Sequence, residues 1–202
     1  MRRDLHFWAV MLMRGFIALL AGSCVLVVPD LARTLLLLPI AIVISILGLA
    51  TYGVIDSVLV LISSFMTESP TARVVLLIQG SAGIGLGLLL LFVVFEQVKL
   101  EWFLSLAALQ AVSTGIGEIV VARHAPTHAV SIWNYAAGAV ALVAAIAYAV
   151  VRIGFAYALQ QRQISWLVYA YLVAFGVALC LTAARMIYAD REAFLHPSAP
   201  RA

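Results

Sequence analysis

Four polar residues, Arg14, Asp56, Gln79 and Glu118, lie inside long apolar runs of the sequence. An unpaired charge at the centre of a membrane-spanning helix costs about 2.5–3.5 kcal/mol on insertion scales, so each ionised side chain strongly favours a partner of opposite sign. A guanidinium can pair with carboxylates, and carboxylates that share one cation can also bind protons. The chemistry that these residue types allow is therefore ion pairing and proton uptake.

The composition of the chain indicates the environment of these four residues. The sequence has 202 residues, of which 65% are hydrophobic and 10% charged, and its mean hydropathy is +1.14. A soluble domain has about 45–50% apolar and about 25% charged residues, so one core cannot hide this excess. The composition predicts an integral membrane protein. It excludes a disordered chain, a disulfide-stapled secreted domain and an ordinary cytosolic enzyme.

Helices that cross the bilayer must position the polar residues. A helix needs about 20 mostly apolar residues to cross a hydrocarbon core of about 30 Å. Short connectors separate such runs, so we expect an all-α bundle of six transmembrane helices, a single domain over residues 1–202, and a flexible C-terminal tail over residues 190–202. The six predicted spans are roughly 7–28, 35–65, 73–95, 102–122, 130–151 and 164–188.

The basic residues predict the orientation of this bundle. With six spans, both termini lie on the same side of the membrane as the second and fourth connectors. Seven arginines fall on that side and four basic residues on the other, which favours cytoplasmic termini. The first set is Arg2, Arg3, Arg73, Arg123, Arg185, Arg191 and Arg201, and the second is Arg33, Lys99, Arg152 and Arg162.

The helices form three similar pairs, over about 7–65, 73–122 and 130–188. Gly15, Gly80 and Gly138 align in the odd-numbered helices, and Gly53, Gly115 and Gly176 align in the even-numbered ones. The separations within the pairs are 38, 35 and 38 residues. Each pair crosses the membrane twice, so all three enter from the same side. The pattern predicts three parallel two-helix repeats around a pseudo-threefold axis.

The positions of the polar residues along the predicted helices place them at similar depths. Arg14 lies about seven residues into the first helix and Asp56 about ten from the end of the second, which gives roughly 11 and 15 Å below the same face. Gln79 and Glu118 fall in the same half of the membrane. Repeat symmetry therefore predicts a polar cluster of these four residues near the central axis.

Two interpretations of this cluster remain open. With one cation and two carboxylates, Glu118 is the residue expected to respond to protons, because its own repeat has Gln79 where the first repeat has Arg14. Alternatively, Arg14 and Asp56 form a structural clamp within the first helix pair, and Glu118 extends its carboxylate to the membrane interface.

The first pair of helices resembles a known family. Arg14-Gly15, Gly22 and Pro29, followed by the segment from Tyr52 to Asp56, resemble the repeat of the HdeD family of small bacterial membrane proteins. The resemblance covers nearly the whole chain as three copies, although Gln79 and Ala137 replace the arginine in the second and third. It implies a six-helix inner-membrane protein linked to acid resistance and stress, and it supplies no reaction.

Three classes of function are compatible with these features. The favoured one is a non-enzymatic, stress-linked membrane protein that acts through contacts with membrane proteins or a second copy. The others are an accessory scaffold subunit and a small proton-coupled transporter or channel. No nucleophile with its base, nucleotide loop or dense basic cluster is present in the sequence, so we expect no enzyme, cofactor or nucleic-acid partner. His124 and His128 flank Pro126, which disfavours a metal site.

Overall fold

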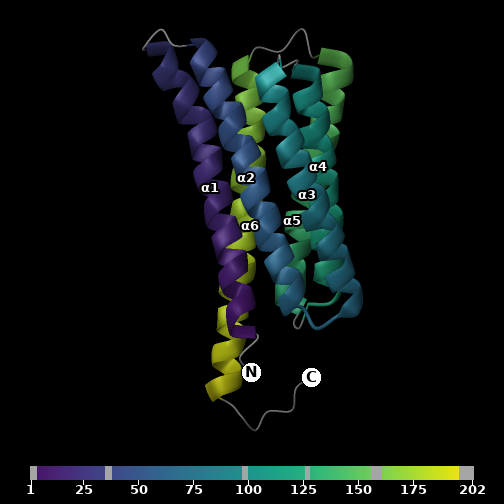
Figure 1. Cartoon of the computed structure of the whole chain (residues 1–202). Helices are drawn as coiled ribbons and strands as arrows, with labels where there is room; N and C mark the ends of the chain where they lie inside the picture. Colours follow the sequence, from purple (N-terminus) through teal and green to yellow (C-terminus); the bar gives the residue numbers. More distant parts are fainter. Residues whose placement is uncertain (1–3, 35–37, 97–99, 126–127, 156–160, 196–202) are drawn as a thin grey trace.

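The computed structural model describes residues 4–34, 38–96, 100–125, 128–155 and 161–195. Over these residues the chain is all-helical, as predicted, with six long helices (Figure 1). In chain order the elements are α1 (Asp4–Thr34), α2 (Leu38–Met66), α3 (Pro70–Glu96), α4 (Leu100–Arg123), α5 (His128–Val150), the π-helical turn η1 (Val151–Phe155) and α6 (Gln161–Leu195).

The helices have the length and the surface of membrane spans. Within the described residues, six helical segments of 20 to 27 residues are apolar enough to cross a bilayer. Large apolar side chains also cover the outside of the bundle: Phe65, Phe92 and Val143 are 68%, 72% and 66% exposed. Lipid tails would cover such a surface, whereas water would not. The structure therefore supports a multi-pass membrane protein.

The observed helix ends lie within three residues of the predicted ones except at two places. The first helix continues through Pro29 to Thr34, because a proline removes a single backbone donor and membrane helices tolerate that loss. The last helix continues to Leu195, so residues 190–195 of the predicted flexible tail are helical. These residues include no proline or glycine, and the first proline of the tail is Pro197. Residues 196–202 lie outside the described part of the chain.

The helices run side by side in alternating directions (Figure 1). We call the end of the bundle where α1 begins and α6 ends the lower end, and the opposite end, where α2 begins, the upper end. Each helix packs against its neighbours in the chain, and α6 also packs against α1, so the contacts close into a ring. Because α6 has 35 residues, or roughly 52 Å at 1.5 Å per residue, it exceeds the thickness of the hydrocarbon core.

Glycines let three pairs of helices approach each other closely. A Cβ built on Gly15 of α1 would lie 2.8 Å from the backbone oxygen of Gly176 in α6. A Cβ on Gly138 of α5 would lie 2.9 Å from the oxygen of Gly115 in α4. These backbones are in contact, which is how helices gain packing where lipid supplies no hydrophobic drive between them.

The corresponding crossing of α2 and α3 uses a serine in place of a glycine. A Cβ on Gly80 would lie 2.9 Å from the backbone oxygen of Ser57. Ser57 lies one helical turn after Gly53, the residue that the sequence alignment paired with Gly115 and Gly176. The Ser57 hydroxyl donates a hydrogen bond of 2.6 Å to the Gly53 carbonyl. Its side chain fits between the helices because Gly83 of α3 has no side chain, and a Cβ added there would overlap Ser57 Oγ. A Cβ on Gly53 meets no heavy atom within 4 Å.

Two apolar clusters fill the interior of the bundle. The lower cluster includes Met11, Val60, Leu76, Val121 and Leu179. The upper cluster includes Leu90, Leu104, Ala111, Val168 and Leu172. Buried polar side chains lie near the boundary of the two clusters, as Asp56 does, and at the level of the lower cluster, as Ser63 and Thr182 do.

Candidate functional site

Arg14 and Asp56 form a buried ion pair between α1 and α2. Arg14 Nε donates a hydrogen bond of 2.8 Å to Asp56 Oδ1, and Arg14 Nη2 donates one of 3.4 Å to Oδ2. The Arg14 residue is 0% exposed and Asp56 is 4% exposed. Two hydrogen bonds from one planar guanidinium fix the orientation of the carboxylate as well as its distance.

Glu118 of α4 lies on the other side of the same guanidinium. Its Oε1 is 2.8 Å from Arg14 Nη1, and both side chains are fully buried. Within the described residues, neither carboxylate oxygen of Glu118 has a partner with the angles of a hydrogen bond, so charge is the main attraction between these two groups. Because Glu118 is buried, the interpretation in which it extends to the membrane interface is wrong. We call Arg14, Asp56 and Glu118 the triad.

Gln79 of α3 enters the interior but does not join the triad. It is buried, and its amide packs against the Cα of Gly117, where an added Cβ would overlap it. Among the described residues, its Oε1 has no hydrogen-bond partner. The structure therefore brings three of the four predicted cluster residues together and places Gln79 beside the residue that precedes Glu118.

Apolar side chains enclose the guanidinium of the triad. Arg14 Nη1 lies 3.7 Å from the sulfur of Met11, and the Phe175 ring centroid is 6.0 Å from the guanidinium carbon. Both residues belong to the lower apolar cluster. A low-dielectric environment strengthens attraction between charges, and it also makes an unbalanced charge costly.

The charge of the triad depends on how many protons it holds. With both carboxylates ionised, one cation and two anions sum to −1. One bound proton brings the sum to zero, and a second brings it to +1. A buried group of this kind can therefore bind or release a proton with a change in its net charge, and the neutral state avoids a buried net charge.

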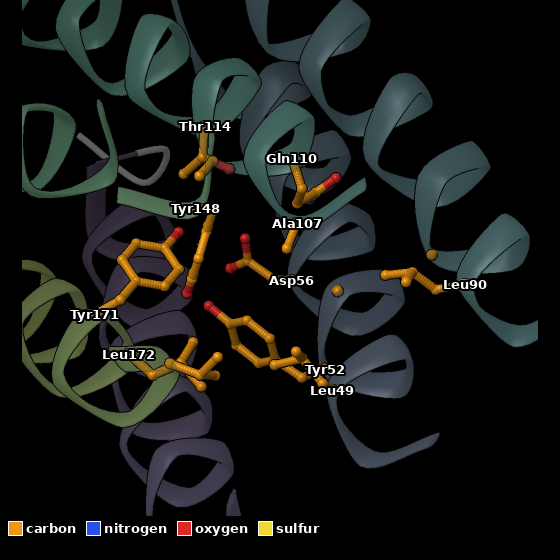
Figure 2. Close-up of a pocket in the computed structure, with 14 residues that line it drawn as sticks. Leu49, Tyr52, Asp56, Leu90, Ala107, Gln110, Thr114, Tyr148, Tyr171 and Leu172 are labelled. Atoms are coloured by element: carbon orange, nitrogen blue, oxygen red, sulfur yellow. The ribbon is translucent and has the colours of Figure 1, made fainter. Parts of the chain in front are cut away.

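The triad borders a cavity that the sequence analysis did not predict. The cavity has a volume of about 50 Å³. In Figure 2 the hydroxyl groups of three tyrosines turn toward the carboxylate of Asp56. The polar residues that line the cavity are Tyr52, Asp56, Gln110, Thr114, Tyr148 and Tyr171.

For two of these tyrosines, the spacing along the helix indicates that the side chain lies on the interior face. Tyr52 lies four residues before Asp56 and therefore on the same helix face. Tyr148 lies seven residues after Ala141, which is fully buried, and so returns to the interior face of α5. Their common target could not be derived from spacing, because it depends on how five helices are rotated against each other.

The described residues provide no metal site, since no group of three or more His, Cys, Asp and Glu side chains among them could hold an ion. His124 lies in the turn after α4, and its Nδ1 is 2.9 Å from the carbonyl of Val120 in the last turn of that helix.

Comparison with family models, with curated proteins and with solved structures finds no match to this chain. The resemblance to the HdeD family therefore stays a prediction that depends on the repeat residues.

Proposed function

We propose that this chain is a non-enzymatic, HdeD-like protein of the bacterial inner membrane, linked to acid resistance or stress. In this proposal it acts through contacts with other membrane proteins or a second copy, and protonation of the triad changes those contacts. The observation that carries the proposal is a single guanidinium held between two buried carboxylates, of which Glu118 is fully enclosed and Asp56 borders the cavity.

The position of the triad explains how one proton can alter the outside of the bundle. Arg14 lies on α1 and Asp56 on α2, two helices that pack against each other, whereas Glu118 lies on α4, which packs against α3 and α5. The attraction between Arg14 and Glu118 therefore acts across the interior of the bundle. When Glu118 binds a proton this attraction weakens, and α4 with its neighbours can shift relative to α1 and α2.

The close crossings support the finer architecture that we propose, three parallel repeats around a pseudo-threefold axis. Each crossing joins an odd-numbered helix to the even-numbered helix of another repeat: α3 to α2, α5 to α4 and α1 to α6. The odd-numbered partner contributes Gly80, Gly138 or Gly15, which the sequence alignment placed in one register.

Exposed basic residues support cytoplasmic termini in this proposal. Among the side chains that the structure describes, Arg73, Arg123, Arg185 and Arg191 are exposed near the lower end of the bundle and Arg152 near the upper end, whereas Arg33, Lys99 and Arg162 lie outside the described side chains. An excess of arginine at one end favours the cytoplasmic side for that end.

Replacing Glu118 by glutamine tests the proposal. The purified protein is placed in lipid nanodiscs, and tryptophan emission and amide hydrogen exchange are followed from pH 8 to pH 4. The wild type should show a transition as the triad binds its proton. Glu118→Gln leaves one cation and one anion, so it should lack that transition and keep the low-pH contacts at neutral pH.

The exchange Glu68→Gln is the matched control, because it makes the same chemical change at an exposed connector position. It should keep the wild-type transition. Proteins that co-purify in mild detergent at pH 7 and pH 5 provide the second readout, and Glu118→Gln should give the pH 5 pattern at both values. An unaltered transition and an unaltered partner pattern in Glu118→Gln would overturn the proposal.

A second candidate function, proton-coupled transport, is favoured by the cavity beside Asp56. Against it, the lower apolar cluster fills the interior on the other side of the triad. Proton flux into lipid vesicles that contain this protein and no other distinguishes the two functions. Transport requires a flux that depends on Asp56, whereas a partner-binding protein produces none.

A further inference from the structure

The cavity beside Asp56 extends in one direction, toward the upper end of the bundle. Residues of α2, α3, α4, α5 and α6 line it. Along α2 its wall runs from Asp56 to Leu49, a distance of seven residues or roughly 10 Å at 1.5 Å per residue. The cavity therefore reaches about two helical turns from the triad toward the upper end.

Gly53 provides independent evidence for unfilled space in this region. It is buried and lines the cavity, yet a Cβ built on it meets no heavy atom within 4 Å. Gly87, on the opposite wall, differs, since its Cβ would lie 2.6 Å from Val54 Cγ2. The space thus lies in front of Gly53, one turn from the carboxylate of Asp56.

Below the triad, the described side chains form the lower apolar cluster. Met11, Val60, Leu76 and Leu179 are all at most 1% exposed and pack in one cluster. We call this lower region the sealed half and the upper region the cavity half. Asp56 belongs to both, because it binds Arg14 in the sealed half and lines the cavity.

Most of the cavity wall is apolar, and its polar groups gather around Asp56, where water can bind. A water molecule needs about 10–15 Å³ of such volume and two to four polar partners, so 50 Å³ has room for roughly three or four molecules. Tyrosine hydroxyls both donate and accept hydrogen bonds, and three of them turn toward this space in Figure 2. A cavity without such groups would stay dry.

We propose that the cavity half holds water and is a one-sided inlet, through which protons reach Asp56 from the upper end of the bundle. A hydronium ion in the cavity releases one proton to a carboxylate oxygen of Asp56 and remains as water. Because Asp56 and Glu118 share the guanidinium of Arg14, a proton on either carboxylate neutralises the triad. The route to the triad depends on the proposed function, whereas the water in the cavity does not.

The groups that face Asp56 come from each of the helices around it. They are Arg14 of α1, Tyr52 of α2, Glu118 of α4, Tyr148 of α5 and Tyr171 of α6, while α3 contributes Gly87 and Leu90 to the cavity wall. The tyrosines offer hydrogen bonds without adding charge.

Hydroxyl-radical footprinting by X-ray radiolysis tests whether water fills the cavity. Radicals form at bound water and oxidise the side chains next to it. In nanodiscs at neutral pH, Tyr171 should be oxidised several-fold more than Phe175, which lies one turn further along α6, is 0% exposed and belongs to the sealed half. Equal oxidation of Tyr171 and Phe175 would overturn the proposal.

Filling the cavity tests whether it is the proton route. Gly53→Leu adds a side chain to the empty space, and Gly48→Leu is the matched control, because Gly48 is exposed on the same helix and also has no heavy atom within 4 Å of an added Cβ. Gly53→Leu should lower oxidation of Tyr171 several-fold and slow the tryptophan response to a pH jump, and Gly48→Leu should change neither. If Gly53→Leu abolishes the oxidation of Tyr171 but the tryptophan response to the pH jump keeps its wild-type rate, the cavity is not the proton route.

Sidedness is tested with vesicles in which all molecules have one orientation. Acid added to the upper-end side should produce a fast response, and acid added to the other side should produce a slow one. Equal rates from both sides would contradict a one-sided inlet. These results are separable from the proposed function: if Glu118→Gln keeps its pH transition the function fails, although footprinting still reports whether the cavity holds water.

Discussion

The sealed half and the cavity half are built from the same helices, but the surroundings of their buried polar groups differ. In the sealed half, the Arg14 guanidinium has no exposed surface and lies among Met11, Phe175 and two buried carboxylates. In the cavity half, the hydroxyl groups of Tyr148 and Tyr171 face unfilled volume. A polar group in the first region depends on a protein partner, whereas one in the second can bind water.

The difference between the two halves shows how a membrane protein can hold a strong ion pair in a dry environment and still let a proton reach that pair. A dry environment makes attraction and charge imbalance large, but it also blocks exchange with solvent. Asp56 resolves this conflict because it lies at the boundary of the two halves. Substitutions in the sealed half should therefore be costly, and equivalent substitutions in the cavity half should be tolerated.

The largest expected effect comes from removing the cation of the sealed half. Arg14→Ala leaves two buried carboxylates without a counter-charge, and breaking a buried pair in this way costs about 3–5 kcal/mol. The cost should be greater at pH 8 than at pH 5, since protons can neutralise the carboxylates at the lower value. Unfolding by sodium dodecyl sulfate in mixed micelles measures the free energy.

Arg73→Ala is the control for this experiment, because Arg73 is exposed near the lower end. It should change the free energy of unfolding by no more than about 0.5 kcal/mol. If Arg14→Ala also changes the free energy of unfolding by a small amount that does not depend on pH, the three charges of the triad do not interact in a dry environment.

A smaller effect is expected where the sealed half meets the crossing of α1 and α6. Gly15→Ala would place a methyl group 2.7 Å from Cys180 Sγ and 2.8 Å from the Gly176 oxygen. The helices must separate, which typically costs about 1–3 kcal/mol. The same unfolding assay measures this loss. A stability equal to that of the wild type would indicate that these backbones do not touch.

The sequence was sufficient to predict the features that depend on position along a helix. The length of the apolar runs predicted six helices, which the structure confirms for the described residues. Counting residues at 1.5 Å each placed Arg14 and Asp56 at similar depth, and the structure pairs them. Depth follows from sequence because the rise of an α-helix hardly varies.

Features that depend on rotation and register between helices could not be predicted in this way. Gln79 has a suitable depth but packs against Gly117 and does not reach the triad. The crossing of α2 with α3 uses Ser57 and not Gly53. Both residues are small enough for a close approach, so residue size along the sequence did not distinguish them. The cavity itself requires five helices to be placed at once.

The smallest expected effect, and the one with the opposite sign, is that of Gly53→Ala in the cavity half. The new methyl group meets no heavy atom within 4 Å, so no helix has to move. Alanine also favours the helix by about 0.5–1 kcal/mol relative to glycine. The free energy of unfolding should therefore rise by about this amount, while Gly15→Ala on the neighbouring helix lowers it. If both substitutions lower stability equally, the space beside Asp56 is filled in the folded protein, and the difference between the two halves disappears.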